Sequence, residues 1–473
     1  MRPLAEVALI NPVDAPSSLF TAEQVMAVPS LATAVTPGVD WAVVVGLRRT
    51  ASDRITRRLA ELAETDSAPL SPLDRRLLGR SLVRTVVAEH AQRLAAGGRA
   101  LWPVETEQAY ALALENAIFG YGRLQPLFEI ADAENIEIHG CESVVVQYGD
   151  GRREQHPPVA DSDEELVEAI RFLGESVSPS RPFDDAHPTM TLALGDRFRL
   201  HAIGFGLSYR PSITIRQHTL VQVTLAELAD GGMLTEELAR LLHAAVLAKK
   251  SIVISGDQGA GKTTLLRALL ASIPANERFG TLETDYELLT HLQPGRGNIL
   301  ALQSRVGMGE IQDGRRLGEY TVADLIPEAL RQNLSRLVVG EVRGGEAGAM
   351  FEAMTAIGGT MSTTHSHSAA STIDRLASRV AQGGVLSIEE AYRQIAHHLH
   401  LLVHVRLIDD TWRGGLRTRV VSEVRQLTGG IEAGRPVTHL VYRAEPDSGG
   451  PSYTPDPGLM AELAPFAAGW RSS

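Results

Sequence analysis

The chain has 473 residues, of which 44% are apolar and 22% charged, with a net charge of −12 and a single cysteine. This composition is typical of a protein with a large buried core and about three domains. The acidic balance opposes nonspecific binding to duplex DNA, and one cysteine excludes both a disulfide within the chain and a zinc site of four cysteines from one chain.

The N-terminal region carries no membrane signal. Residues 7–10 are too short for the apolar part of a signal peptide, and no stretch reaches the ~18 consecutive apolar residues of a membrane helix. We therefore expect a cytoplasmic protein that meets a membrane only through a partner. Residues 1–48 are rich in Pro, Ala and Ser and predict a loosely ordered leader, with a short helix near Thr21–Val28.

Residues 49–106 predict a small helical subdomain, because apolar residues recur at helical spacing in Arg54–Ala63 and Leu73–Leu94. Pro72 suits the first position of the second helix. Residues 107–218 predict an α+β domain, and residues 219–229 predict a linker. The expected elements of the α+β domain are helices at 108–119 and 164–173 and strands at 136–141, 143–148, 197–203 and 212–216.

Residues 230–425 alternate strand and helix patterns, which predicts an α/β domain with a largely parallel sheet covered on both faces. The expected strands are 251–255, 279–283, 337–340 and 361–364, and the expected helices are 234–247, 264–270, 324–332, 345–356 and 371–381. Patterns at 417–424 and 438–442 predict a terminal hairpin. Residues 426–473 thus hold its second strand and, from Glu445, a tail expected to be partly disordered.

Residues 256–263 match the phosphate-binding pattern G-x-x-x-x-G-K-[ST], between a predicted strand and a predicted helix. The glycines let backbone N–H groups curl around an anion, and the helix directs its positive end there. Lys262 adds a mobile charge for the β- and γ-phosphates, and the Thr263 hydroxyl is placed to bind Mg²⁺. The predicted nucleotide-binding residues are Gly256, Asp257, Gln258, Gly259, Ala260, Gly261, Lys262, Thr263 and Thr264.

Hydrolysis also needs acids and cations near the terminal phosphate, and three predicted strand ends supply candidates. Glu283 ends one strand and Glu287 lies four residues later, although a solvated acidic turn is the alternative for this pair. Glu341 follows an apolar strand in the Walker B arrangement and is set to hold a water or the Mg²⁺ shell. His365 ends the next strand and could sense the γ-phosphate or relay to Glu341, although a lone histidine is more often structural.

Together these motifs resemble the ATPases of type II and type IV secretion systems, and the nearest branch is the CpaF-like one that powers tight-adherence (Flp) pilus assembly. The resemblance implies a RecA-like P-loop ATPase domain with Glu283 and Glu287 as its acidic box, Glu341 as its Walker B acid and His365 in its histidine box. It spans roughly residues 107–425 and includes Gly120-x-Gly-x-Leu-x-Pro-Leu, Thr214-Ile-Arg216, the phosphate loop, Leu282-Glu283-x-x-x-Glu287-Leu, Gly340-Glu-Val-Arg-Gly-x-Glu346-Ala and Thr363-x-His365.

The resemblance further implies ATP and Mg²⁺ as cofactors, with Thr263 and, through water, Glu341 at the metal. It implies a homo-hexamer, peripheral at the inner face of the cell membrane, that acts through an inner-membrane platform protein on pilins or secreted proteins without direct nucleic-acid contact. In this family an N-terminal domain closes over the nucleotide, and arginines meet the phosphates. The matching positions are Arg199, Arg216 and, less closely, Arg305, each of which taken alone is more often a surface charge.

The chain departs from the family pattern at Thr284, at Ile357 and in residues 332–336, which leaves turnover rate and coupling open. The absence of the cysteines of a zinc module favours the tight-adherence or type IV-like branch. Four histidines suggest a metal cluster, but two of them are adjacent and cannot share a helix face, so we do not expect a metal there. They are His397, His398, His400 and His404.

Two other functions stay open. A nucleic-acid motor shares the core fold, but the acidic balance and the low content of aromatic residues (5%) oppose it. A nucleotide-loaded scaffold is the other alternative, if the departures abolish hydrolysis. The motifs carry no signature of the transported substrate, of assembly as against retraction, or of the platform partner.

Overall fold

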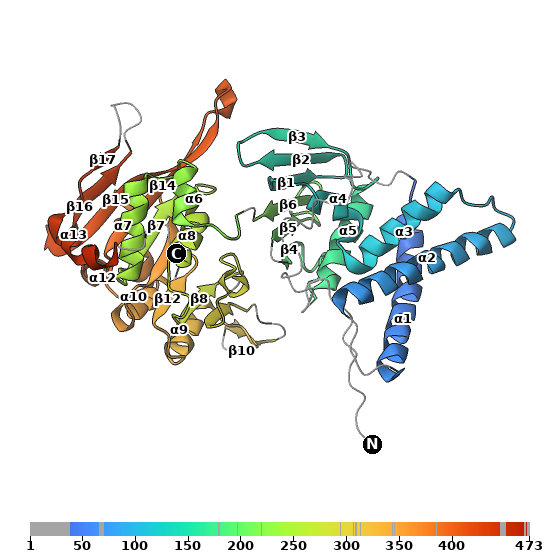
Figure 1. Ribbon diagram of the computed structural model, residues 1–473, viewed down its shortest axis with the longest axis horizontal. Helices are drawn as coiled ribbons and strands as arrows, with labels where there is room; N and C mark the ends of the chain where they lie inside the picture. The colour runs from blue at the N-terminus through green and yellow to red at the C-terminus, as the bar shows by residue number, and fades with distance from the viewer. Residues whose placement is uncertain are drawn as a thin grey trace, which may run out of the picture. The chain divides into compact units, whose positions relative to one another are not determined.

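The chain divides into two compact units, Met1–Thr219 and Leu220–Ser473, and each is described by itself (Figure 1). The structure is a computed structural model. It describes residues 38–65, 71–177, 180–195, 197–218, 220–293, 295–305, 307, 310–312, 314–342, 344, 346–384, 386–444, 451–467 and 470.

The first unit begins with three packed helices, α1 (Trp41–Thr65), α2 (Pro72–Ala96) and α3 (Val104–Phe119). Their shared core includes Val44 and Leu114, which are fully buried. Pro72 is the first residue of α2, as predicted. The expected leader is wrong for residues 41–48, because α1 already begins there. The helix expected at Thr21–Val28 lies outside the described residues, and a domain boundary after residue 106 would cut α3.

The rest of the first unit is a six-stranded antiparallel sheet in the order β3-β2-β1-β6-β5-β4. Its strands alternate buried and exposed residues, and the buried face forms one core with α5. The sequence patterns did not show β3 and β4. The elements are η4 (Gly122–Leu124), α4 (Gln125–Phe128), β1 (Ala133–His139), β2 (Ser143–Tyr148), β3 (Arg153–His156), α5 (Asp163–Ser176), β4 (Thr189–Leu194), β5 (Phe198–Ile203) and β6 (Ser212–Gln217).

The second unit is built on a nine-stranded sheet in the order β17-β16-β15-β14-β7-β13-β12-β8-β9. The strands from β14 to β9 are parallel, and β15, β16 and β17 extend the sheet with antiparallel pairs. The predicted parallel sheet is therefore confirmed as part of a mixed one. The strands are β7 (Ile252–Gly256), β8 (Phe279–Glu283), β9 (Ile299–Gln303), β12 (Arg336–Val339), β13 (Met361–His365), β14 (Leu401–Asp409), β15 (Arg417–Glu432), β16 (Arg435–Arg443) and β17 (Ser452–Tyr453). A separate small hairpin joins β10 (Ile311–Gln312) to β11 (Arg315–Arg316).

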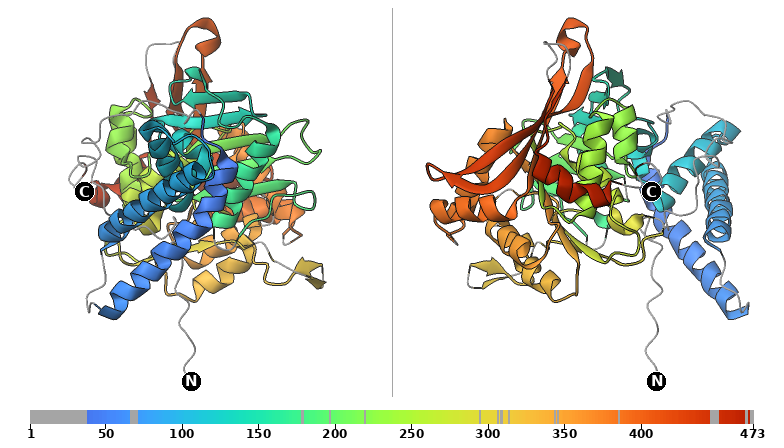
Figure 2. Two further views of the ribbon diagram at one scale, coloured as in Figure 1. Left: turned by 90° about the vertical axis from the view of Figure 1, so that its right-hand side faces the viewer. Right: turned by 60° about the vertical axis from the view of Figure 1, so that its left-hand side comes forward.

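Helices cover both faces of this sheet, as predicted (Figure 2). Ile252 and Ile254 of β7 belong to one core and Val253 to the other, as strand alternation requires. The first core contains α6 (Leu225–Asp230), α7 (Glu236–Leu247), α8 (Lys262–Ala271) and α13 (Pro457–Leu463), and the second contains α9 (Val322–Leu330), α10 (Glu346–Ala356), α11 (Ala369–Gln382) and α12 (Ile388–His398). The remaining short turns are η5 (Thr290–Leu292), η6 (Thr411–Arg413) and η7 (Ala464–Phe466).

Two expectations for the ends of the second unit are wrong. The expected linker contains α6, which a capping box between Thr224 and Glu227 starts. The expected disorder does not hold for residues 451–467, because β17 pairs with β16 and α13 buries Leu459 and Leu463 in the core. The predicted hairpin is confirmed as β15 and β16, although β15 runs to Glu432, past the predicted boundary at residue 425.

A buried ion pair ties β12 to neighbouring loops of the second unit. The Arg336 side chain is 1% exposed and donates hydrogen bonds to Glu277 Oε1 at 2.8 Å and to the carbonyl of Val246. We expect Arg336→Ala to lower the free energy of unfolding by about 3 kcal/mol, because the Glu277 carboxylate loses its buried cation and keeps the more exposed Lys249, whose Nζ lies 3.5 Å away. Urea unfolding of the full chain measures this loss.

The control for this variant is Arg331→Ala, since Arg331 and Glu328 form an exposed ion pair. Exposed pairs contribute about 1 kcal/mol or less, so this variant should stay close to the parent. Equal losses in the two variants would contradict the role given to the buried pair.

Candidate nucleotide-binding site

The predicted phosphate loop connects the end of β7 to the start of α8. Gly259 and Gly261 have φ values of +74° and +93°, a region that residues with a Cβ rarely adopt. Gly261 is the residue before the first turn of α8, so the backbone N–H groups at the start of that helix open onto the loop. The structure therefore confirms the strand–loop–helix context that a phosphate-binding loop requires.

Lys262 is 7% exposed, and its side chain folds back over the loop. The Nζ atom donates hydrogen bonds to the carbonyl oxygens of Gly256 at 3.1 Å and Asp257 at 2.9 Å. It also lies 3.3 Å from Nδ1 of His365, at the end of β13. The ammonium group is thus held at the mouth of the loop, within reach of a neighbouring strand end.

His365 connects the phosphate loop to the Walker B acid. Its Nε2 atom lies 3.0 Å from Oε1 of Glu341, on the side of the ring opposite Lys262. The Thr363 hydroxyl donates to the carbonyl of Gly340 at 2.7 Å, and the Thr364 hydroxyl donates to that of Val342 at 3.0 Å. These bonds tie the segment that carries Glu341 to β13. The His365 ring therefore contacts the Lys262 ammonium with one nitrogen and the Glu341 carboxylate with the other.

Glu283, at the end of β8, is 4% exposed. Its Oε1 atom accepts hydrogen bonds from the backbone N–H groups of Glu287 at 3.0 Å and Leu288 at 2.9 Å, whereas Oε2 has no hydrogen-bond partner among the described residues. Burial raises the pKa of this carboxyl to about 7, because the charged form loses its hydration, and the two N–H groups only partly oppose this. A Cβ at Gly340 would lie 2.9 Å from Cγ of Glu283, so glycine admits the carboxyl beside β12.

Glu287 lies in the turn after β8, where its backbone carbonyl accepts a hydrogen bond from Nε of Arg267 at 2.9 Å. Its own side chain is half-buried, and so are the side chains of Thr263 and Thr264 in the first turn of α8. Asp257 of the loop pairs with Nδ1 of His367 at 2.8 Å, a contact that the motifs did not predict. The roles of these side chains toward a ligand stay predictions.

The three arginines fall in different places. Arg199 in β5 and Arg216 in β6 lie directly opposite each other in the sheet of the first unit. Arg305 belongs to the second unit, where its Nε donates to the carbonyl of Gly318 at 2.6 Å and its guanidinium lies 5.2 Å from the ring centre of Tyr320. Contact of any of the three with a nucleotide stays a prediction.

Two further arginines, which the motifs did not single out, contact the phosphate loop. Nε of Arg419 in β15 donates to the carbonyl of Gly259 at 2.8 Å, and Arg417 lies beside the same glycine. The available signal was the spacing Arg-x-Arg in a predicted strand, which places both side chains on one face. Whether that face meets the phosphate loop depends on the order of the strands in the sheet.

Two of the four clustered histidines have structural partners. The backbone N–H of Ser251 donates to Nδ1 of His400 at 3.1 Å, and Nδ1 of His404 lies 2.9 Å from Oγ of Ser255. Burial lowers the pKa of both imidazoles, because it disfavours the charged form.

Among the described residues, no helix has the length and apolar character of a membrane span.

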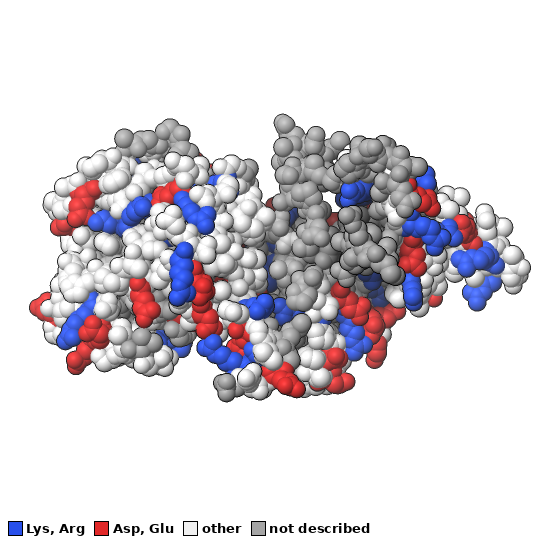
Figure 3. Space-filling view, turned by 90° about the horizontal axis from the view of Figure 1, so that it is seen from below, with Lys and Arg blue, Asp and Glu red and all other residues white. Residues whose placement is uncertain are grey.

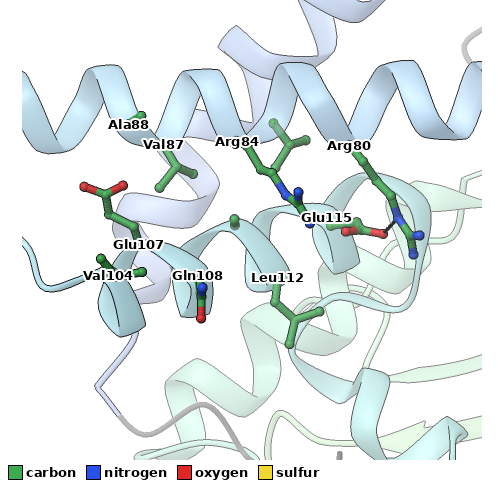
Figure 4. A pocket seen from close by; sticks show the side chains of 11 residues that line it. Arg80, Arg84, Val87, Ala88, Val104, Glu107, Gln108, Leu112 and Glu115 are labelled. Carbon is green, nitrogen blue, oxygen red and sulfur yellow. Dashed lines mark hydrogen bonds and ion pairs between the residues drawn. The ribbon is translucent and has the colours of Figure 1, made fainter. Parts of the chain in front are cut away.

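A cavity of about 520 Å³ lies elsewhere, against α2 and α3 of the first unit (Figure 4). Arg80, which pairs with Glu115, lies at one end of it and Val104 at the other. None of the residues that line it belongs to the predicted site. The candidate nucleotide-binding residues of the second unit lie in the phosphate loop and at the strand ends, and none of them lines this cavity.

A phosphate-loop motif followed by acid-bearing strand ends is the arrangement typical of P-loop nucleotide-binding proteins. Residues 162–424, more than half of the chain, match the family described as "Type II/IV secretion system protein". The chain belongs to this family, whose members are ATPases of secretion systems.

Two individual relatives come from Mycobacterium tuberculosis and Brucella suis. The chain is 29% identical over 330 residues to a "putative conjugal transfer protein" of Mycobacterium tuberculosis, which covers 68% of this chain and 89% of the relative. It is 28% identical over 261 residues to the type IV secretion system protein VirB11 of Brucella suis, covering 50% and 69% of the two chains. The crystal structure of that VirB11 ATPase in complex with sulphate aligns with a TM-score of 0.33 at 24% identity, covering 64% of this chain and 92% of the other.

The buried carboxyl of Glu283 makes stability depend on pH. The pKa of Glu283 is about 7 in the folded protein and near 4.5 in the unfolded chain, so folding favours the protonated form. Its contribution to stability is complete below pH 4.5 and is lost as the pH rises through 7. A shift of this size corresponds to about 3 kcal/mol.

We expect Glu283→Gln to remove this pH dependence, because the amide oxygen can still accept from the N–H groups of Glu287 and Leu288 while no charge forms. The measurement is urea unfolding of the parent and the variant at pH 5 and pH 8. The variant should gain stability relative to the parent at pH 8. The same difference at both pH values would show that Glu283 does not titrate in this window.

Proposed function

We propose that the chain is a Mg²⁺-dependent ATPase that works as a homo-hexameric motor for pilus assembly or protein secretion. The observation that carries this proposal is the line of contacts from Lys262 through His365 to Glu341. A protein that only binds a nucleotide needs the loop and its lysine. A carboxylate and an imidazole directed at the same point are what hydrolysis adds.

The residues present fit a magnesium ion that is bound together with a nucleotide. Among the described residues, no group of three or more His, Cys, Asp or Glu side chains could hold a metal alone. Mg²⁺ suits such a site, because it keeps several waters and takes further oxygens from substrate phosphates. The Thr263 hydroxyl and, through water, Glu341 would hold it, and the bound ion would neutralise charge on the phosphates. The buried Oε2 of Glu283 adds an oxygen in the same part of the site.

The protein groups divide the chemistry among themselves. The loop N–H groups and Lys262 bind the phosphates, and Glu341 orients the attacking water. His365 lies between the ammonium of Lys262 and the carboxylate of Glu341. A change in either contact when the γ-phosphate leaves would therefore reach the other through the imidazole. This gives a physical route from hydrolysis to movement of the segment that carries Glu341.

The motor role draws on the family and on two arginines of the first unit. Arg199 and Arg216 lie opposite each other on neighbouring strands, which places two positively charged side chains next to each other. We infer that they meet the phosphates of a bound nucleotide when the first unit closes over a site in the hexamer. Arg305 is a weaker candidate for the same role, because its guanidinium already contacts Gly318 and Tyr320.

The setting follows from the same family. We infer that the hexamer lies in the cytoplasm at the inner face of the membrane, where an inner-membrane platform protein passes its movement to pilins or secreted proteins. The motif resemblance favours the CpaF-like, tight-adherence branch. Among the described residues on the face shown in Figure 3, acidic and basic side chains are mixed.

Hydrolysis by the purified chain tests the proposal. We expect Lys262→Ala and Glu341→Gln each to lower the rate of phosphate release at saturating ATP at least a hundredfold. Lys262→Ala loses the ammonium group that binds the phosphates, and Glu341→Gln loses the carboxylate that orients water. Glu341→Gln should still bind ATP. Glu328→Gln is the matched control, since Glu328 is an exposed acid on α9.

Two results would contradict this assignment. Equal, non-zero rates in the parent, Lys262→Ala and Glu341→Gln would show that these residues do not carry hydrolysis. ATP binding by the parent with no phosphate release would instead select a nucleotide-loaded scaffold.

The arginines of the first unit make a separate prediction. We expect Arg199→Ala and Arg216→Ala to lower kcat at least tenfold in the assembled protein, because arginines that neutralise charge on a transferred phosphoryl group act mainly on the rate. The control is Arg153→Ala, which removes an exposed arginine from β3 of the same sheet. Unchanged kcat in both variants would place these arginines outside the site.

A further inference from the structure

The three glycines of the phosphate loop all approach the β14–β15 hairpin, and Gly261 also lies against Met233, whose Cε would be 3.3 Å from a Cβ there. A Cβ at Gly256 would overlap the backbone carbonyl of Val405 in β14. A Cβ at Gly259 would lie 3.5 Å from Nη2 of Arg417, and one at Gly261 would lie 3.4 Å from Cδ of Arg419. The hairpin therefore forms a wall against which the loop is folded, and the loop glycines allow that close approach.

One hydrogen bond fixes a peptide of the loop to this wall. Nε of Arg419 donates to the carbonyl oxygen of Gly259 at 2.8 Å. In a trans peptide the N–H points away from the carbonyl, so the N–H of Ala260 is directed into the loop. There it donates a hydrogen bond to the carbonyl oxygen of Asp257 at 3.3 Å. An anion in the loop would compete with this carbonyl oxygen for the N–H.

The hairpin holds Arg419 in this position. Leu407 of β14 pairs with Arg419 of β15 in the antiparallel register, and its Cδ2 would lie 3.8 Å from a Cβ at Gly259. Arg417, two residues earlier on the same face, lies within 3.6 Å of Asp409. Arg406 precedes Leu407 and therefore points to the opposite face of the sheet, where it is exposed.

We propose that the β14–β15 hairpin is part of the phosphate-binding site and that Arg419 is its positioning residue. Gly259 can adopt backbone angles that other residues cannot, and a flipped peptide between Gly259 and Ala260 would turn a carbonyl oxygen toward the phosphate instead of an N–H. Arg419 prevents that flip through the Gly259 carbonyl, and Arg417 adds positive charge beside it. The inference rests on the nucleotide binding in the proposed function, but it does not require hydrolysis.

The test is the affinity of the full-length protein for ADP, measured by isothermal titration calorimetry. We expect Arg419→Ala to weaken ADP binding at least tenfold, because the loop then binds with one peptide free to turn. Arg419→Lys should bind ADP with an affinity within about threefold of that of the parent, since an ammonium can also donate to the Gly259 carbonyl. Arg406→Ala, which removes the same charge from the other face of the hairpin, should bind ADP as the parent does.

The unfolding midpoint of each variant without nucleotide separates positioning from stability. A large drop in ADP affinity with a midpoint close to that of the parent supports the proposal. The proposal is overturned if Arg419→Ala binds ADP like the parent, or if Arg419→Lys is as weak as Arg419→Ala. A parent that binds ADP but hydrolyses no ATP would end the proposed function and leave this inference standing. A parent that binds no ADP would end both.

Discussion

The placement of β7 between β13 and β14 is the constraint on which the site depends. In a parallel sheet the carboxyl ends of neighbouring strands meet at one edge, so the phosphate loop after β7 opens beside the end of β13. That order brings Lys262 to His365 and, across the same strand end, His365 to Glu341. None of these contacts survives a different strand order, however well each motif is preserved.

The two sides of the phosphate loop are chemically different. On the β13 side lie an imidazole and two acids, Glu341 and the buried Glu283, which suits the end of a nucleotide where a bond is broken. On the β14 side lies a hairpin that presents Arg417 and Arg419 to the loop backbone. In the proposed function, the first side carries the reaction and the second side positions the loop.

Sequence patterns predicted those parts of the site that depend on local chemistry. The phosphate loop, the strand that ends at Glu283 and the Walker B position of Glu341 each follow from a few adjacent residues. The role of Arg419 could not be predicted, because its contact with Gly259 joins residues 160 positions apart through the sheet order. The C-terminal tail was misjudged for a related reason: its Pro and Gly residues suggest disorder, whereas burial of Leu459 against the sheet stabilises a helix there.

The most direct measurement of the central claim is a double-mutant cycle on His365→Ala and Glu341→Gln, with single-turnover phosphate release as the readout. If the imidazole and the carboxylate act as one unit, the double variant should be about as slow as the slower single variant. If the two rate losses multiply instead, His365 and Glu341 act independently. That result would contradict the line of contacts from Lys262 to Glu341 as the basis of hydrolysis.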